Sequence, residues 1–155
     1  MSPQKTSQYQ AYSLATRTVA KTRQVVMLYD GAIRFLRQAK EAIAEKRIED
    51  RFNLLKRAAD IMTGLQSSID FDNGGEVASV LHQFYTNMTT RILSVNFKRE
   101  GGEQECDTLI EELKQMRDVW DSIDRNLNTQ DNSNGATPAP SDTPPAEASS
   151  ITLSA

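Results

Sequence analysis

The segment LYDGAIRFL, Leu28 to Leu36, carries two opposing structural signals. Its apolar residues recur at intervals of three and four positions, which is typical of one face of an α-helix. At its centre lies Asp30-Gly31, a dipeptide typical of tight turns, and a glycine inside a helix costs about 1 kcal/mol relative to alanine. Because the apolar pattern continues in phase from Leu28 through Ala32 to Leu36, we expect an unbroken helix.

Gly31 and Ala32 then give this helix a low patch, because neither residue has a large side chain. Another segment can approach the helix closely at such a patch. The candidates are a neighbouring helix, the N-terminal segment of the chain and a bound partner. A neighbouring helix is the simplest of the three.

Four segments show helical spacing, and none shows the two-residue alternation of a β-strand. They cover residues 22–46, 49–69, 76–98 and 103–127, with short breaks that include DFDNGG and a second glycine pair. At 1.5 Å per residue each helix is about 30–38 Å long. Short connections between helices of similar length make successive helices antiparallel. The sequence therefore predicts an all-α fold, an antiparallel up-down four-helix bundle.

Each predicted helix has a broad apolar stripe that we expect to face the core. The stripes consist of Val25, Leu28, Tyr29, Ala32, Ile33, Leu36, Ala39 and Ile43; Phe52, Leu55, Ala58, Ala59, Met62, Leu65 and Ile69; Val77, Leu81, Phe84, Tyr85, Met88, Ile92 and Val95; and Cys106, Leu109, Ile110, Leu113, Met116, Trp120, Ile123 and Leu127. Further apolar residues lie beside the stripes: Val26, Met27, Phe35, Leu54, Ile61, Val80 and Leu93. They indicate either a wide core or a surface groove for an amphipathic partner helix.

The two ends of the chain differ from this body. Residues 1–21 are polar apart from a few anchors such as Tyr9 and Tyr12, and we expect a flexible segment that is loose or lies along a groove. Residues 128–155 hold four of the five prolines and almost no large apolar residue. This tail cannot bury enough surface to offset its ordering entropy, so we expect it to be disordered. The predicted folded domain is residues 22–127.

Charge and apolar content limit the class of protein. The chain has 18 Lys and Arg against 21 Asp and Glu, and three of the acids lie after residue 130, so residues 1–130 are formally neutral. Nucleic-acid binding depends on neutralising phosphates, so it is not expected. No apolar run approaches the roughly 20 residues that span a bilayer, and the N-terminus lacks the apolar core of a signal peptide. We expect a soluble cytoplasmic protein without membrane insertion.

The sequence gives little support for an enzyme or a cofactor. The Glu-x-x-His pair of di-iron bundles is absent, since Ser79 precedes the single histidine, His82, at that spacing. DFDNGGE resembles the start of a calcium loop, but Gly74 and Leu81 occupy the fifth and twelfth positions, which need oxygen ligands. The single cysteine, Cys106, excludes a disulfide framework and a multi-cysteine zinc site, and we expect it in the core. We predict no enzymatic activity, no metal and no cofactor.

Five motifs occur in a fixed order along the chain: QYQAY, MLYDGA, NGGEVA, FYTNMTTRILSVN and DVW. Together they resemble the flagellin export chaperone family, FliS. Its members have a tyrosine-rich N-terminal segment, M-L-[YF]-[DN]-G in the first helix, and G-G-E-I-A followed by L-Y-x-Y-M-x-x-R-L-x-x-A-N in the third. The resemblance covers Tyr9 to Ile123 without large insertions.

The resemblance implies a four-helix bundle that binds the disordered C-terminal segment of flagellin in the cytoplasm. Family members keep flagellin from polymerising before export and pass the complex to the export gate protein FlhA. Their N-terminal segment can occupy a groove that the client later takes. A second hypothesis, from another class, is an adaptor or scaffold bundle that forms a homodimer or docks a regulator.

The motif positions give candidate residues for client or groove contact. These are Tyr9, Tyr12, Leu28, Tyr29, Gly31, Ala32, Ala78, Leu81, Tyr85 and Met88. Trp120 matches the closing tryptophan of the family, but for Trp120, Leu81 and Leu93 a core position is the leading interpretation. The chain departs from the family pattern at VAKTRQ, which lacks the usual capping proline, and at Val95 and Val119, which replace alanines.

Overall fold

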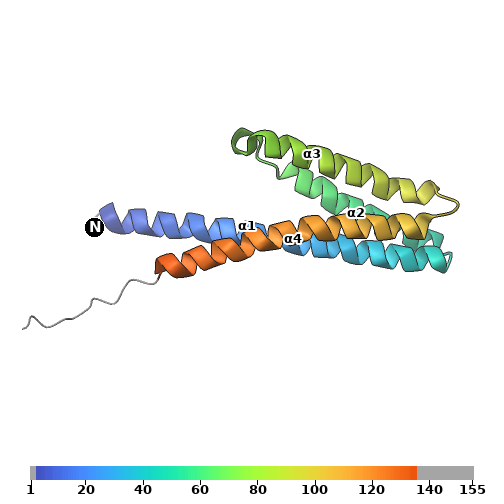
Figure 1. Cartoon of the computed structure of the whole chain (residues 1–155), viewed down its shortest axis with the longest axis horizontal. Helices are drawn as coiled ribbons and strands as arrows, with labels where there is room; N and C mark the ends of the chain where they lie inside the picture. Colours follow the sequence, from blue (N-terminus) through green and yellow to red (C-terminus); the bar gives the residue numbers. More distant parts are fainter. Residues whose placement is uncertain (1–2, 136–155) are drawn as a thin grey trace, which may run out of the picture.

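A computed structural model describes the backbone of residues 3–135 and the side chains of residues 21–135 (Figure 1). The described chain is helical and contains no strand. Its elements are α1 (Pro3–Ala44), α2 (Ile48–Ser67), α3 (Phe71–Ser94), the one-turn 3₁₀ helix η1 (Val95–Phe97) and α4 (Gly102–Gly135). Successive helices run antiparallel, which confirms the predicted all-α four-helix bundle.

Helix α1 begins at Pro3, well before the predicted start at residue 22. Proline is favoured in the first turn of a helix, and no glycine or proline interrupts the chain from there to Gly31. Figure 1 shows the first part of α1 projecting past α2 and α3. Tyr9 and Tyr12 belong to this part, but their side chains lie outside the described residues. Their predicted groove contact therefore stays a prediction.

The turns at the closed end of the bundle use left-handed backbone. Lys46 has φ +58° after α1, and Gly101 has φ +79° before α4. Gly102 is buried: a Cβ atom there would lie 3.4 Å from Ile43 Cδ1 and 3.6 Å from Val95 Cγ1. α4 continues to Gly135, so residues 128–135 are helical where the sequence predicted the start of a disordered tail. Residues 136–155 are not described.

The core contains most of the predicted stripe residues, and the largest fully buried side chains come from all four helices. Four stripe residues are instead exposed: Leu28 (41%), Phe52 (54%), Val77 (66%) and Ile123 (40%). Conversely Val26, expected beside the stripe, is fully buried. Val26 lies three and seven positions before Tyr29 and Ile33, so its side chain shares their face of the helix, whereas that of Leu28 is rotated away.

The other apolar residues beside the stripes divide into two groups. Phe35, Leu54 and Ile61 are partly buried against the core, so they widen it. Met27, Val80 and Leu93 are exposed. The wide core is therefore confirmed for the first group, whereas contact of the second group with a partner helix stays a prediction.

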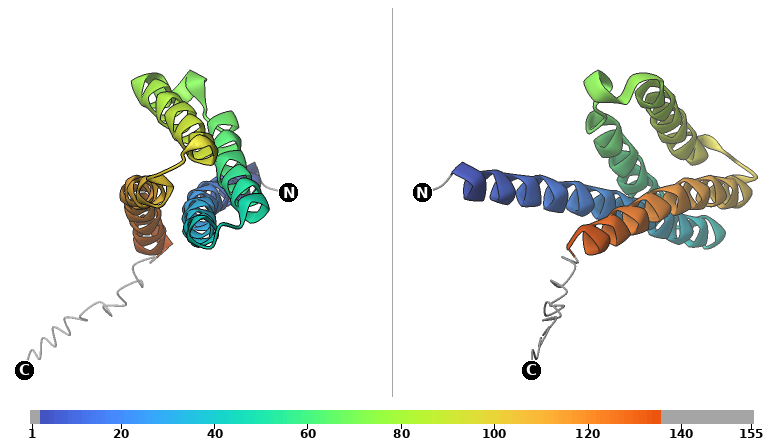
Figure 2. Two further views of the ribbon diagram at one scale, coloured as in Figure 1. Left: turned by 90° about the vertical axis from the view of Figure 1, so that its right-hand side faces the viewer. Right: turned by 60° about the vertical axis from the view of Figure 1, so that its left-hand side comes forward.

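The four helices do not pack equally. α1 contacts both α2 and α4 extensively, and α2 contacts α3, but α3 and α4 barely touch. Figure 2 shows α3 diverging from α4. One side-chain clasp joins the two helices: the Arg91 guanidinium donates to Glu105 Oε1 at 3.0 and 3.1 Å and to both Glu112 oxygens at 2.7 and 2.9 Å. The bundle is therefore open between α3 and α4 from Arg91 toward the N-terminal end of α3.

Candidate functional site

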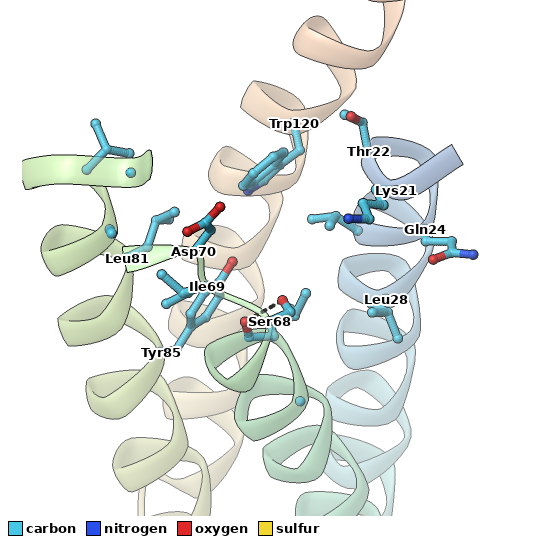
Figure 3. Close-up of a pocket in the computed structure, with 16 residues that line it drawn as sticks. Lys21, Thr22, Gln24, Leu28, Ser68, Ile69, Asp70, Leu81, Tyr85 and Trp120 are labelled. Carbon is cyan, nitrogen blue, oxygen red and sulfur yellow. Dashed lines mark hydrogen bonds between the residues drawn. The ribbon is translucent and has the colours of Figure 1, made fainter. Parts of the chain in front are cut away.

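A groove of about 520 Å³ lies at the end of the bundle where α2 ends and α3 begins (Figure 3). All four helices contribute to it, and most of its lining is apolar. The apolar side chains are Val25, Leu28, Leu65, Ile69, Val77, Ala78, Leu81, Tyr85 and Trp120. Exposed polar residues, among them Lys21, Gln24 and Asp70, complete the lining. We call this site the open-end groove.

Asp70 begins one wall of the groove by capping α3. Its Oδ1 accepts hydrogen bonds from the backbone N–H groups of Asp72 (3.1 Å) and Asn73 (3.2 Å). The Asn73 side-chain amide donates to Oδ2 at 2.7 Å. These bonds hold the pKa of the Asp70 carboxyl below its usual value, and the bond from the Asn73 side chain has the largest effect. The segment DFDNGG therefore serves as a helix cap, with its first carboxylate committed to the backbone.

Two glycines then shape the first turn of α3. Gly75 has φ +52° and ψ −133°, a conformation that residues with a Cβ atom rarely adopt. A Cβ atom on Gly74 would lie 2.7 Å from Ala78 Cβ, which is closer than real contacts allow. Gly74, Val77 and Ala78 all line the groove. The glycine pair therefore sets the course of the chain along this wall.

Two tyrosines meet at the floor of the groove, where Tyr85 lines it and Tyr29 lies beneath. Tyr29 of α1 donates its hydroxyl hydrogen to Tyr85 Oη at 3.0 Å, and both side chains are buried. Burial is the main cause that raises the pKa of both phenols, and for Tyr29 the neighbouring Tyr85 adds to it. Both tyrosines therefore stay neutral at physiological pH.

Trp120 of α4 completes this cluster. Its indole N–H faces the two phenols closely enough to lower the pKa of each. Burial raises both pKa values by more, so the net shift is upward. It nevertheless makes no hydrogen bond of standard geometry, and Trp120 Nε1 is buried without a partner. Figure 3 shows Trp120 and Tyr85 approaching the same space from α4 and α3. The most polar point deep in this apolar groove is thus the Tyr29–Tyr85–Trp120 cluster.

The structure divides the predicted contact residues. Four line the open-end groove: Leu28, Ala78, Leu81 and Tyr85. Tyr29 lies beneath it, bonded to Tyr85. Three are buried elsewhere in the bundle and do not line the open-end groove: Gly31, Ala32 and Met88. They face neighbouring helices, and a Cβ atom on Gly31 would lie 3.4 Å from Ile61 Cδ1 of α2.

Sequence reasoning missed several groove residues by assigning them to the core. Trp120 was the most important, and Val25, Ile69 and Val77 were others. All belong to predicted apolar stripes; Ile69 lies in the break between α2 and α3, and Val77 lies in the second turn of α3. A stripe residue beside a helix end has fewer neighbours to cover it. That position was the signal that could have identified them.

Several known proteins resemble this chain in sequence. A family model described as flagellar protein FliS matches residues 3–127. A flagellar secretion chaperone FliS of Campylobacter jejuni is 31% identical over 119 residues, which are 76% of this chain and 91% of that protein. The chain belongs to the FliS family. A Vibrio cholerae FliS is 34% identical over 99 residues, 64% of this chain and 71% of that relative, and a Pseudomonas aeruginosa FliSB is 27% identical over 118 residues, 75% and 92%.

Membership in the FliS family confirms the resemblance carried by the five motifs. The matched residues 3–127 include every residue that lines the open-end groove. The relatives are named as secretion chaperones, which places the chain among chaperones and not among enzymes. Within the described residues, no helix is both long and apolar enough to cross a membrane.

Proposed function

We propose that this FliS-family protein is a cytoplasmic export chaperone that binds the disordered C-terminal segment of flagellin in its open-end groove. Binding prevents premature polymerisation, and the complex is delivered to the export gate protein FlhA. One observation carries the proposal: an apolar groove that all four helices line, at the end where α3 and α4 diverge. Such a groove suits the apolar face of a partner helix.

The area needed for such a client extends beyond the groove. Ordering a disordered segment costs several kcal/mol, so the interface has to bury about 1,000–3,000 Å². Exposed apolar side chains continue from the groove: Val80 lies one turn after Val77 on α3, and Ile123 lies one turn after Trp120 on α4. They support a client that runs from the groove along the outer faces of α3 and α4.

The direct test is calorimetric titration of the full chain with the C-terminal segment of flagellin from the same organism. We expect one-to-one binding with a strongly negative heat-capacity change, because apolar surface is buried. Leu81→Glu, which puts a charge into the groove, should abolish binding. Phe52→Glu is the matched control, since Phe52 is an exposed apolar residue outside the groove on α2, which the proposed client path does not follow. It should bind as the unchanged chain does.

Absence of binding at micromolar concentrations would reject the flagellin proposal and leave the adaptor hypothesis, which a homodimer in solution would favour. Deletion of residues 1–20 tests the N-terminal segment separately. If that segment competes for the groove, deletion leaves the client affinity unchanged or raises it. A large loss of affinity would mean that Tyr9 and Tyr12 contact the client.

A further inference from the structure

Hydrogen-bond donors exceed acceptors at the bottom of the open-end groove. The Tyr29–Tyr85–Trp120 cluster has three donors: two phenol O–H groups and one indole N–H. Tyr29 uses its hydrogen on Tyr85 Oη. Among the described residues, no acceptor of standard geometry receives the Tyr85 hydrogen, and Trp120 Nε1 is buried without a partner. Two donors therefore remain.

Two polar side chains of the groove lining are held in place at helix ends. The Asp70 carboxylate accepts from Asp72 and Asn73 at the start of α3. The Ser68 hydroxyl donates to the Leu65 carbonyl oxygen at 2.7 Å, which closes α2. Both groups are held at helix ends by these bonds, and neither accepts a hydrogen bond from Tyr85 or Trp120. A buried donor without an acceptor is unfavourable, and a ligand that supplies one binds better than a purely apolar ligand.

We propose that a neutral amide oxygen of the bound client segment accepts hydrogen bonds from Trp120 Nε1 and Tyr85 Oη. The inference rests on the proposed function and adds the client chemistry: an otherwise apolar helical stretch with one Asn or Gln side chain, or one unpaired backbone carbonyl at a helix end. A single buried polar contact of this kind fixes the register of the client, because sliding by a turn leaves the donors unsatisfied. An apolar groove alone allows such sliding.

A neutral oxygen fits better than a carboxylate. Burying a charge requires a paired opposite charge, and the cluster offers only neutral donors. The one basic residue of the lining, Lys21, is exposed. Asp70 also lines the groove and carries a negative charge at neutral pH, since its carboxyl pKa is lowered. It therefore disfavours a second carboxylate there.

The chain has a single tryptophan, so its indole N–H gives one resolved signal in a ¹⁵N-labelled sample. This signal in the full, unmodified chain tests the inference during titration with the flagellin C-terminal segment. We expect a downfield shift of the indole proton and slower exchange with water. An indole signal that keeps its position and exchange rate while the client binds would overturn the inference.

Trp120→Phe supplies a second test, because it keeps the aromatic surface and removes the donor. Thermal unfolding first checks that the variant folds; if it does not, the indole signal alone decides. We expect client affinity about 3- to 10-fold weaker, the typical worth of one hydrogen bond. Thr108→Val is the control: it removes a hydroxyl that bonds the Gln104 carbonyl on the same helix, away from the groove, and should leave affinity unchanged.

Client variants identify the source of the oxygen. Asn→Leu and Gln→Met changes, made one at a time in the flagellin segment, are measured against both the unchanged chain and Trp120→Phe. If one client change weakens binding to the unchanged chain but not to Trp120→Phe, the oxygen belongs to that side-chain amide. Weaker binding by Trp120→Phe without any sensitive client side chain identifies a backbone carbonyl. Equal affinity of Trp120→Phe and the unchanged chain overturns this inference alone, whereas no binding by the unchanged chain overturns the proposed function as well.

Discussion

Asp30 of α1 and Arg117 of α4, 87 positions apart, form an ion pair in which Arg117 Nε lies 2.9 Å from Asp30 Oδ1. The next residue, Gly31, faces α2 instead, where Ile61 covers it. A dipeptide typical of turns thus lies within an unbroken helix and contacts two neighbouring helices. The Asp30 carboxylate pairs with Arg117 of α4, and the lack of a side chain on Gly31 leaves room for Ile61 of α2. The low patch is filled by a side chain of the bundle.

Gly31→Ala should raise the free energy of unfolding by about 0.5–1 kcal/mol, because alanine is the better helix former. The added Cβ atom would lie 3.4 Å from Ile61 Cδ1, which is ordinary contact with a movable side-chain end. Urea denaturation measures the change. Gly31→Leu, which overfills the same place, should cost about 1–3 kcal/mol. A less stable alanine variant would mean that α1 and α2 approach too closely there for any side chain.

Gly75→Ala should lower the free energy of unfolding by about 1–3 kcal/mol, because φ +52° with ψ −133° strains any residue with a Cβ atom. Gly64→Ala is the matched control. Gly64 lies within α2 and a Cβ atom there would meet nothing within 4 Å, so the change should stabilise the protein slightly. Thermal unfolding of both variants checks the pair. Equal effects would contradict the strained turn.

Arg91→Met should loosen the contact between α3 and α4. Arg91 is partly exposed, so solvent screening limits the loss to about 1–2 kcal/mol, and added salt should diminish it. Amide hydrogen exchange along α3 should become faster. Arg91→Lys keeps the charge but cannot bridge Glu105 and Glu112 in the same way, so it should recover only part of the loss. Full recovery would show that charge alone suffices.

The two tyrosines should respond unequally to loss of their hydroxyl groups. Tyr29→Phe removes the donor and should cost about 1 kcal/mol, whereas Tyr85→Phe leaves the buried Tyr29 hydroxyl without its acceptor and should cost about 1–3 kcal/mol. The double variant should cost less than the sum of the two, because no unsatisfied phenol remains. Urea denaturation of all three variants measures the coupling, and strict additivity would speak against the hydrogen bond.

Cys106 predicts a defined dependence of stability on alkaline pH. Burial, with smaller effects of Asp107 and Glu105, raises the pKa of its thiol from 9.0 to about 11. The unfolded chain therefore loses this proton at lower pH than the folded chain, and stability falls as pH rises from 9 to 11 by about 1.4 kcal/mol per unit. Because the buried tyrosines act in the same direction, the measurement is the difference between the chain and Cys106→Ala. A difference independent of pH would contradict the shift.

Much of the fold follows from local sequence. The break at Gly101-Gly102, the antiparallel order and most of the core stripes were predicted correctly. The break between α2 and α3 lies at residues 68–70, and α3 begins at Phe71 within DFDNGG, five residues before the predicted start, because Asp70 caps the helix. Helix formation depends on residues within a few positions of one another, so periodicity and breakers are sufficient. The early start of α1 was missed because the stretch before residue 22 has polar residues and no strong stripe, although nothing in it breaks a helix.

The candidate groove was only partly predictable. Motif positions led to Leu28, Ala78, Leu81 and Tyr85, but the same reasoning also selected Ala32 and Met88, which are buried in the core. An apolar residue at the edge of a stripe looks the same in sequence whether it faces the core or a groove. The choice depends on the rotation of the helix and on whether a neighbour covers that place.

The sequence by itself determined the four helices, their antiparallel order and the FliS family. Tertiary structure alone decided the divergence of α3 from α4, the open-end groove and the meeting of Tyr29, Tyr85 and Trp120 at its floor. The reason is physical. Helical periodicity is a local property of the chain, whereas burial and hydrogen-bond partners depend on which side chains other helices bring to the same place.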